Sequence, residues 1–266
     1  MKLKVDHLTC YRYDAPVRLS TQYLRLFPHG NAQQRILDWR LDTPGNPVRT
    51  LDGFGNVLHV LTLDTPTHEI AIRARGTVET GAASEDDKGP SSLSPLIFTR
   101  VTPLTRVDEA LAAFAERFRR RASGLSGLRE FASAVSRAMP FQPGEQGSGL
   151  GAPEAFAKAS GASPDQAQVF VAGCRYLGVP ARYVSGYAYV PVHTGPLVGS
   201  HAWAEAWVVD RWRSFDIAYE RPAGEDHIKL AIGADSLDAS PIRGVRVGGG
   251  SESMTAQARV QQAVEQ

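Results

Sequence analysis

The amino-acid sequence predicts an α+β protein in which an N-terminal antiparallel β-domain precedes a core of helices packed on an antiparallel sheet. Three observations carry this prediction. Residues 1 to about 80 alternate polar and apolar side chains between glycine- and proline-containing turns. Residues 81–103 are rich in Gly, Ser, Pro and charge, which is typical of a linker. Helical spacing then gives way to strand-like segments. We therefore predict a β-domain with its linker at 1–100 and a core at 101–266.

The β-domain is expected to hold several short strands. The first runs from Lys2 to Tyr13, where apolar residues share one phase of the alternation. Clusters of Pro, Gly, Asn and Asp separate the later candidates. Short strands at this spacing are typical of a sandwich or a curved sheet. The later strand candidates are residues 23–27, 35–39, 57–63 and 70–78.

The core is expected to begin with two helices within residues 106–139 and a short helix at 153–159, because apolar residues recur there every three or four positions. The central helix is predicted at Gln166–Leu177 and should be buried. Gly178 and Pro180 supply its stop signal. The apolar residues at helical spacing along it are Ala167, Phe170, Val171, Cys174 and Leu177.

Strands should follow the central helix, because the remaining segments are rich in aromatic and β-branched residues. Three glycines at 248–250 then precede a polar tail at 251–266. The sequence leaves open whether that tail adds an edge strand or forms a helix. The strand candidates are residues 181–189, 200–207, 211–216, 228–232 and 242–247.

Composition limits the classes of function. The 29 basic and 28 acidic residues give a net charge of +1, so we expect no nucleic-acid partner and no membrane partner. Neither a secretory pattern nor a run of about 20 apolar residues is found. The two cysteines, Cys10 and Cys174, are far apart, and the simplest expectation is a cytoplasmic chain. We expect no metal and no organic cofactor, because no zinc-ligand spacing and no dinucleotide fingerprint occurs.

Three segments carry a family resemblance: YLGVPARYVSGY at 176–187, SHAWAEAW at 200–207 and Phe-Asp at 215–216. They resemble the bacterial transglutaminase-like family, which shares its catalytic plan with papain-like cysteine proteases. The N-terminal strands and GADSLDASPIRG fit as well, so the resemblance covers nearly the whole chain. It implies a papain-like core with an accessory β-domain. It also implies a Cys-His-Asp site in which His201 is the base and Asp216 orients it.

Ser163 stands where that family has its nucleophilic cysteine. Amide acyl transfer needs a nucleophile, a base and a group that orients the base, and a helix N-terminus helps to stabilise a thiolate and an oxyanion. A serine hydroxyl ionises far less readily than a thiol. The run Ser163-Pro164-Asp165-Gln166 is also a complete helix-start signature with Ser163 as N-cap. Ser163 is therefore either a non-catalytic cap or a nucleophile, whether native or replacing a native cysteine.

Other departures from the family pattern favour natural divergence. Pro164 and Gln168 stand where the family often has Gln and His. Ala234 and Ser236 replace the Arg and Tyr often found in its Gly-Arg-Asp-Tyr segment. An engineered knockout would change one position, so the scatter indicates a diverged site.

Strand spacing alone does not bring His201 to Asp216. A tight turn at Asp210-Arg211 would place Asp216 opposite Glu205, with His201 roughly 13 Å further along its strand. The resemblance implies that His201 and Asp216 meet, and Glu205 is the alternative partner for a group in the cleft.

The other thiol and imidazole groups are interpreted more simply. Cys174 lies in an apolar helix and is expected to be a buried core thiol. His193, in a Pro/Gly loop, and His227, before a strand, are expected to be incidental or packing residues.

The sequence thus predicts a transglutaminase-like protein with a degenerate site, Ser163-His201-Asp216, that is catalytically impaired and binds a peptide or protein partner in a retained cleft. The alternative is an active amide acyl-transfer enzyme of the protease, amidase or transglutaminase type. Such an enzyme would use Ser163 itself or be a Cys-to-Ser trapped form. The substrate, the acyl acceptor and the oligomeric state do not follow from the sequence.

Overall fold

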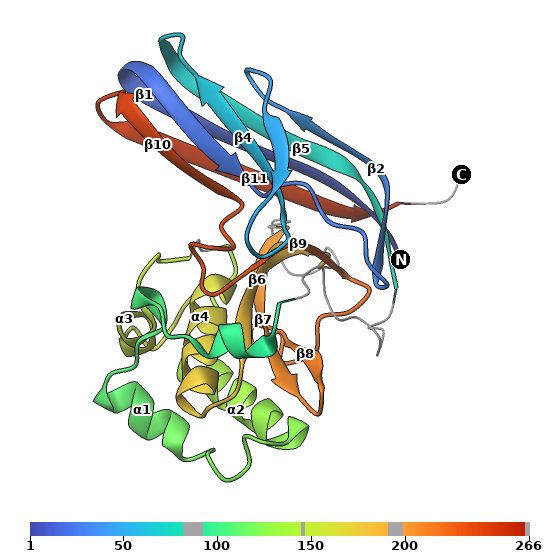
Figure 1. Cartoon of the computed structure of the whole chain (residues 1–266), viewed down its shortest axis with the longest axis vertical. Coiled ribbons are helices and arrows are strands. Elements are labelled where there is room, and N and C mark those ends of the chain that lie inside the picture. Colours follow the sequence, from blue (N-terminus) through green and yellow to red (C-terminus); the bar gives the residue numbers. More distant parts are fainter. Residues whose placement is uncertain (82–92, 145–146, 191–198, 264–266) are drawn as a thin grey trace.

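A computed structural model describes residues 1–81, 93–144, 147–190 and 199–263 (Figure 1). These residues form two antiparallel sheets, one in the β-domain and one in the core, with helices on one side of the core sheet. The predicted α+β class is therefore confirmed. None of the helices in this part of the chain is both long enough and apolar enough to cross a membrane.

The β-domain sheet is built around one long strand. Strand β1 continues to Leu24, well beyond the predicted end at Tyr13. Its first half pairs with β5 and β11, and its second half pairs with β4 and β10. Strand β2 adds to β5, and β3 adds to β4. The strands are β1 (Lys2–Leu24), β2 (Gln34–Asp42), β3 (Val48–Leu51), β4 (Val57–Leu63), β5 (Thr67–Thr80), β10 (Ile242–Gly248) and β11 (Glu252–Gln262).

The C-terminal strands correct the predicted placement of all of 101–266 in the core. Strands β10 and β11 pair with β1, and Figure 1 shows these red strands beside the blue one. Ala258 and Val260 in β11 are buried and pack with Leu3 and Val5 of β1. The tail is therefore a strand, because its alternate apolar side chains complete the hydrophobic face of the first sheet.

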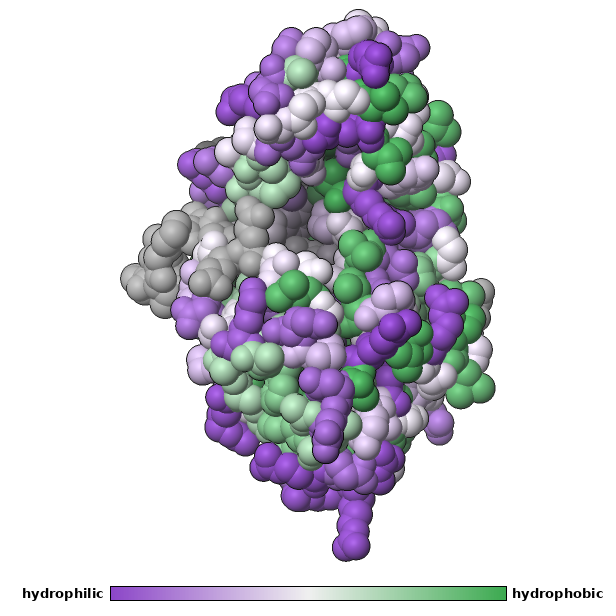
Figure 2. Space-filling model, turned by 90° about the vertical axis from the view of Figure 1, so that its left-hand side faces the viewer, coloured by the Kyte–Doolittle hydropathy of each residue, from purple (hydrophilic) through white to green (hydrophobic). Residues whose placement is uncertain are grey.

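Apolar side chains remain exposed on the β1–β10 half of that sheet. Leu19 is opposite Val247, and both are more than 40% exposed. Val245 is exposed on the same face, since residues two apart on a strand point the same way. On the side shown in Figure 2, hydrophobic residues gather over the β-domain and continue toward the core.

The core packs helix α4 against a sheet of order β8-β7-β6-β9, and the other three helices pack on α4. Two 3₁₀ turns, η1 (Pro95–Thr99) and η2 (Pro103–Thr105), lead into it. The helices are α1 (Glu109–Glu116), α2 (Leu125–Ala138), α3 (Ala152–Ala157) and α4 (Ser163–Tyr176). The strands are β6 (Ala181–Ala188), β7 (Ser200–Val208), β8 (Arg211–Phe215) and β9 (His227–Gly233).

Helix α4 is the buried centre of the core, as the sequence predicts. Phe170 and Cys174 are both 0% exposed. The face of β7 toward this cluster consists of Ala202, Ala204 and Ala206, whose small side chains let the helix lie close to the sheet. Burial raises the pKa of the Cys174 thiol, so the predicted inert core thiol is confirmed.

Candidate active site

Ser163 is the first residue of α4 rather than its N-cap, so the helix begins one residue earlier than the helix-start signature predicted. Ala162 is the N-cap, with extended φ and ψ of −75° and 166°. Asp165 fills the third position, and its carboxylate accepts the Ala162 backbone N–H at 3.3 Å. The prediction that the Ser163 hydroxyl caps the helix is therefore wrong. The helix-start signature fits two registers, and the Asp165 carboxylate stabilises the earlier one.

The Ser163 hydroxyl instead contacts the sheet. Its Oγ accepts the backbone N–H of Ala202 at 3.3 Å. Strand β8 leaves β7 at the Phe215–Ala204 pair, so Ala202 has no partner strand on that side. The Ala202 N–H is therefore available to bond to Ser163, the first residue of α4. This contact places Ser163 beside His201.

His201 and Asp216 are in direct contact. His201 Nε2 lies 2.7 Å from Asp216 Oδ2, and both side chains are buried. The expectation from strand spacing is corrected, because the turn is Val209-Asp210 and Glu205 faces Ser214. Asp216 lies past the end of this ladder and is held in a bridge to Arg221. After Phe215 the chain no longer follows the β7–β8 ladder, and this allows the Asp216 carboxylate to point toward His201.

A second histidine meets the same carboxylate. His227 Nε2 lies 2.9 Å from Asp216 Oδ2, and its Nδ1 lies 2.7 Å from Asp226 Oδ1. The expectation that His227 is incidental is therefore wrong. Asp216 and His227 flank the loop that joins β8 to β9, and the only sequence signal was the Asp226-His227 dipeptide at the start of a strand.

The ionisation of this cluster follows from its contacts. Burial by itself would raise the pKa of Asp216, but hydrogen bonds from His201 and His227 outweigh it and hold the pKa well below its usual range. Burial alone would lower the pKa of His227, yet its bonds to Asp216 and Asp226 raise it. An imidazolium at position 227 can donate from both ring nitrogens, one to each carboxylate.

His201, Asp216 and His227 also offer three ligand atoms within 4.8 Å of one another. The sequence did not reveal this cluster, because its members are separated by 15 and 11 residues. The separations of 2.7 and 2.9 Å are hydrogen-bond lengths, whereas tetrahedral zinc ligands at ~2.0–2.1 Å from the metal stand about 3.3 Å apart. The geometry therefore favours a hydrogen-bonded triad over a metal centre, and the expected absence of a metal stays a prediction that elemental analysis would check.

Aromatic side chains cover the histidine. Tyr219 stacks on His201 at a ring-centroid distance of 5.1 Å and meets Phe141 edge-on at 5.5 Å. Its backbone N–H donates to Asp216 Oδ1 at 3.3 Å, which fixes the ring over the site. Ser163 and His201 are only 5% and 7% exposed, so the site is almost closed to solvent in this arrangement.

A loop also covers the first turn of α4. Ser148 donates to Asp165 Oδ1 from its backbone N–H at 2.9 Å and from its hydroxyl at 2.6 Å. A side chain at Gly147 would meet Pro164 at 2.7 Å, so only glycine allows this approach. Loop and helix are therefore joined directly over the Ser163 end of α4.

Replacing His227 by Gln should cost stability in a pH-dependent way. A group whose pKa is raised on folding stabilises most below its unfolded pKa of about 6.5, and this contribution fades as pH rises through the folded value. We expect His227→Gln to lose about 2–3 kcal/mol at pH 6 and less at pH 8.5, since hydrogen bonds to charged groups are worth about 1.5–3 kcal/mol. Urea unfolding at the two pH values measures this, and an equal loss at both would contradict a charged His227.

The geometry defines a papain-like core: a buried helix presents its first residue to the start of a strand whose histidine is held by an aspartate. Two family models match the chain. Residues 3–79 match the bacterial transglutaminase-like N-terminal region, and residues 112–217 match the transglutaminase-like superfamily. Together they cover more than half of the sequence. The chain therefore belongs to the transglutaminase-like superfamily, as the resemblance implied.

Full-length relatives and a solved structure support the same fold. An uncharacterized protein of Mycobacterium leprae is 26% identical, with 95% of this chain and 96% of the relative covered. An uncharacterized protein of Mycobacterium tuberculosis is 24% identical, with 92% and 87% covered. The crystal structure of a "Putative Cysteine Protease" from Cytophaga hutchinsonii superposes with a TM-score of 0.70 at 20% identity, covering 100% of this chain and 92% of that one.

Proposed function

We propose that this protein is a catalytically impaired transglutaminase-like homologue that binds an extended peptide or protein segment where its relatives would process one. The observation that carries the proposal is the hydrogen bond of the Ser163 hydroxyl. Its Oγ accepts the Ala202 N–H, and among the described residues no hydrogen bond joins it to His201. A serine nucleophile needs a base within about 2.6–3.2 Å, so the hydroxyl is not activated in this arrangement.

The binding part of the proposal rests on what remains assembled. The His201–Asp216 pair is intact, and Asp216 also lines a cavity of about 250 Å³ between α2 and the loop after β8. Ser133 and Glu220 line this cavity too, and they are hydrogen-bonded to each other at 2.5 Å. Tyr219 is half-buried over His201 and offers an aromatic surface to an incoming segment.

The proposal that Ser163 is not an active nucleophile is tested with a fluorophosphonate probe, which reacts with serines that a base activates. We expect no adduct on Ser163 by peptide mass spectrometry after incubation of the intact protein. The matched controls are Ser163→Ala and His201→Ala. An adduct on Ser163 that disappears in His201→Ala would contradict impairment and establish the alternative, an active amide acyl-transfer enzyme that uses Ser163.

The proposal that the protein binds an extended peptide segment is tested with fluorescein-labelled β-casein as the extended polypeptide. We expect a saturable rise in fluorescence anisotropy that Tyr219→Ala weakens at least fivefold, because the ring forms part of the surface over His201. Tyr176→Ala, at the opposite end of α4, is the matched control and should leave affinity unchanged. An equal effect of both substitutions, or no saturable binding by the wild type, would contradict a peptide site near His201.

A further inference from the structure

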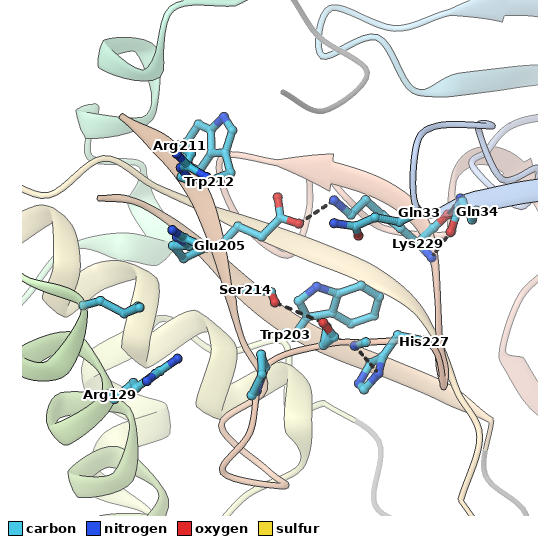
Figure 3. A pocket seen from close by; sticks show the side chains of 15 residues that line it. Gln33, Gln34, Arg129, Trp203, Glu205, Arg211, Trp212, Ser214, His227 and Lys229 are labelled. Carbon is cyan, nitrogen blue, oxygen red and sulfur yellow. Dashed lines mark hydrogen bonds and ion pairs between the residues drawn. The ribbon is translucent and has the colours of Figure 1, made fainter. Parts of the chain in front are cut away.

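His227 is the first residue of β9, and the β-domain holds that strand in place. Strand β9 is an edge of the core sheet, so one side of its backbone has no partner strand among the described residues. The buried Gln34 side chain bonds to that backbone: its Nε2 donates to the Lys229 carbonyl and its Oε1 accepts the Lys229 N–H, both at 2.8 Å. Asn56 bonds to Ile232 in the same way, at 2.7 and 2.8 Å. Figure 3 shows Gln34 beside Lys229, with His227 earlier on the same strand.

The His227 ring is also held by contacts within the core. Its Nδ1 lies 2.7 Å from Asp226 Oδ1 and 3.2 Å from the backbone nitrogen of Gly224. The indole ring of Trp203 meets the imidazole edge-on, with 5.2 Å between the ring centroids. His227 is only 5% exposed, so solvent has almost no access to the ring. These contacts leave Nε2 directed at Asp216, 2.9 Å away.

Asp216 depends on hydrogen-bond donors because it is almost completely buried. The residue is 1% exposed, and its Oδ2 accepts from two imidazoles, His201 at 2.7 Å and His227 at 2.9 Å. The other oxygen, Oδ1, accepts a longer bond from the Tyr219 N–H at 3.3 Å. Burial favours the protonated form of a carboxyl group, and hydrogen bonds to the charged form oppose this effect. Both imidazole donors therefore help to keep Asp216 ionised.

We propose that His227 is a positioning residue of this site, which donates to Asp216 and thereby keeps His201 with a proton on Nε2 and a lone pair on Nδ1. A carboxylate can only accept hydrogen bonds, so the bond from His201 to ionised Asp216 places the imidazole proton on Nε2. Burial alone would lower the pKa of His227, but its bonds to Asp216 and Asp226 raise it, which favours the form that donates.

Loss of the His227 donor has a definite consequence for His201. The buried Asp216 charge would then be compensated by one proton taken up from water. If that proton rests on Asp216, the carboxyl group donates to Nε2 of His201 and the ring proton moves to Nδ1. If it rests on the ring, both nitrogens carry a proton. In either case Nδ1 of His201 loses the lone pair that a base needs.

The proposal goes beyond the binding function and does not rest on it. The pair of His201 and Asp216 belongs to the site whether or not Ser163 reacts. Through His227 the site extends to the far edge of the core sheet, and through Gln34 it extends to the β-domain. The accessory domain is therefore expected to support the geometry around His201.

Two-bond ¹H–¹⁵N correlation NMR of the intact protein, labelled with ¹⁵N-histidine, reports which ring nitrogens carry a proton. At pH 8 a free imidazole is neutral, since its pKa is about 6.5. We expect wild-type His201 to show a protonated Nε2 and an unprotonated Nδ1. His227→Leu removes the donor and should convert most of the His201 signal to a form with a protonated Nδ1. His227→Gln retains an amide donor and should keep the wild-type pattern.

His59→Leu is the matched control, because His59 is 8% exposed and lies on β4, outside this cluster. It should leave the His201 signals unchanged. Spectra of His201→Ala and His227→Gln assign the two rings by the signals that each variant lacks. A wild-type His201 pattern in folded His227→Leu would overturn the proposal, and so would equal changes in His227→Leu and His227→Gln.

The wild-type protein provides a further test that holds even if His227→Leu does not fold. We expect its His227 to carry a proton on Nε2. An unprotonated Nε2 could not donate to Asp216 and would overturn the proposal. These signals depend neither on peptide binding nor on labelling of Ser163, so failure of this proposal is distinguishable from failure of the proposed function.

Discussion

Ser163→Cys should create the most reactive thiol in this protein. We expect the introduced thiol to react with iodoacetamide at pH 7 at least tenfold faster than Cys10 or Cys174. Both native cysteines are buried, and burial raises the pKa of each thiol. Position 163 instead lies at the first residue of a 14-residue helix, next to His201. Helix N-termini and neighbouring histidines are the environments that lower a cysteine pKa.

The magnitude follows from the thiolate fraction. A thiol with a pKa of about 8.5 is roughly 3% ionised at pH 7, and a pKa near 7 makes it about half ionised. Because the site is covered by Tyr219, labelling also reports how often that cover opens. The stability cost should be small, since Ser163 does not cap α4 and only the bond from Ala202 is weakened.

Mass spectrometry resolves labelling at the three cysteines, and His201→Ala in the Ser163→Cys background is the control. Loss of the rate advantage in that double variant shows that the histidine activates the thiol. An introduced thiol no more reactive than a free cysteine in a denatured sample would contradict a poised histidine. The cleft around position 163 would then be a binding surface without a poised catalytic histidine.

Glu205→Gln should be the most destabilising single substitution on the sheet. Glu205, Arg182 and Lys229 are all at least nine-tenths buried, and Glu205 pairs with both cations. Burial would raise the Glu205 pKa, but the two cations bring it down to about 2. Removing this charge takes from the buried guanidinium of Arg182 the carboxylate that it pairs with, and breaking a buried ion pair in this way typically costs about 3–5 kcal/mol.

The pH dependence of this loss has a definite sign. A carboxyl group with a lowered pKa stabilises the fold above its unfolded value of about 4.3 and loses that contribution as pH falls toward 2. Urea unfolding should therefore show a constant difference between Glu205→Gln and wild type from pH 5.5 to 8, and a smaller one below pH 4.

Asp6→Asn is the matched control, because Asp6 pairs with Arg73 across two strands with both side chains 43% exposed. Such pairs contribute less than about 1 kcal/mol. Comparable losses for the buried and the exposed carboxylate would contradict the expected role of burial.

The fold was largely predictable because its centre is encoded locally. The apolar spacing of α4 and its glycine stop predict a buried helix, and the following aromatic segment predicts β6. The start of α4 was less predictable, since Ala162 and Ser163 can both precede a first turn that contains Asp165. Only packing selects between them, because the Ser163 hydroxyl has an alternative donor in Ala202.

The candidate site was predictable only in part. His201 and Asp216 came from family resemblance, whereas strand spacing placed them apart. Their contact depends on a chain that leaves the ladder after Phe215 and returns through Arg221, and no periodic pattern encodes such a departure. His227 was missed for the same reason. Its role depends on β9 reaching the site from the far edge of the sheet.

The pairing of β1 with β10 and β11 has a consequence for biosynthesis. The ribosome makes β1 first, but two of its four partner strands are among the last residues to emerge. Until then a 23-residue strand has an unpaired edge along much of its length, which is a template for association between nascent chains. Premature termination at residues 240–241, after the core is complete but before β10, should therefore damage the N-terminal sheet more than the helical core, although the missing residues follow the core in the sequence.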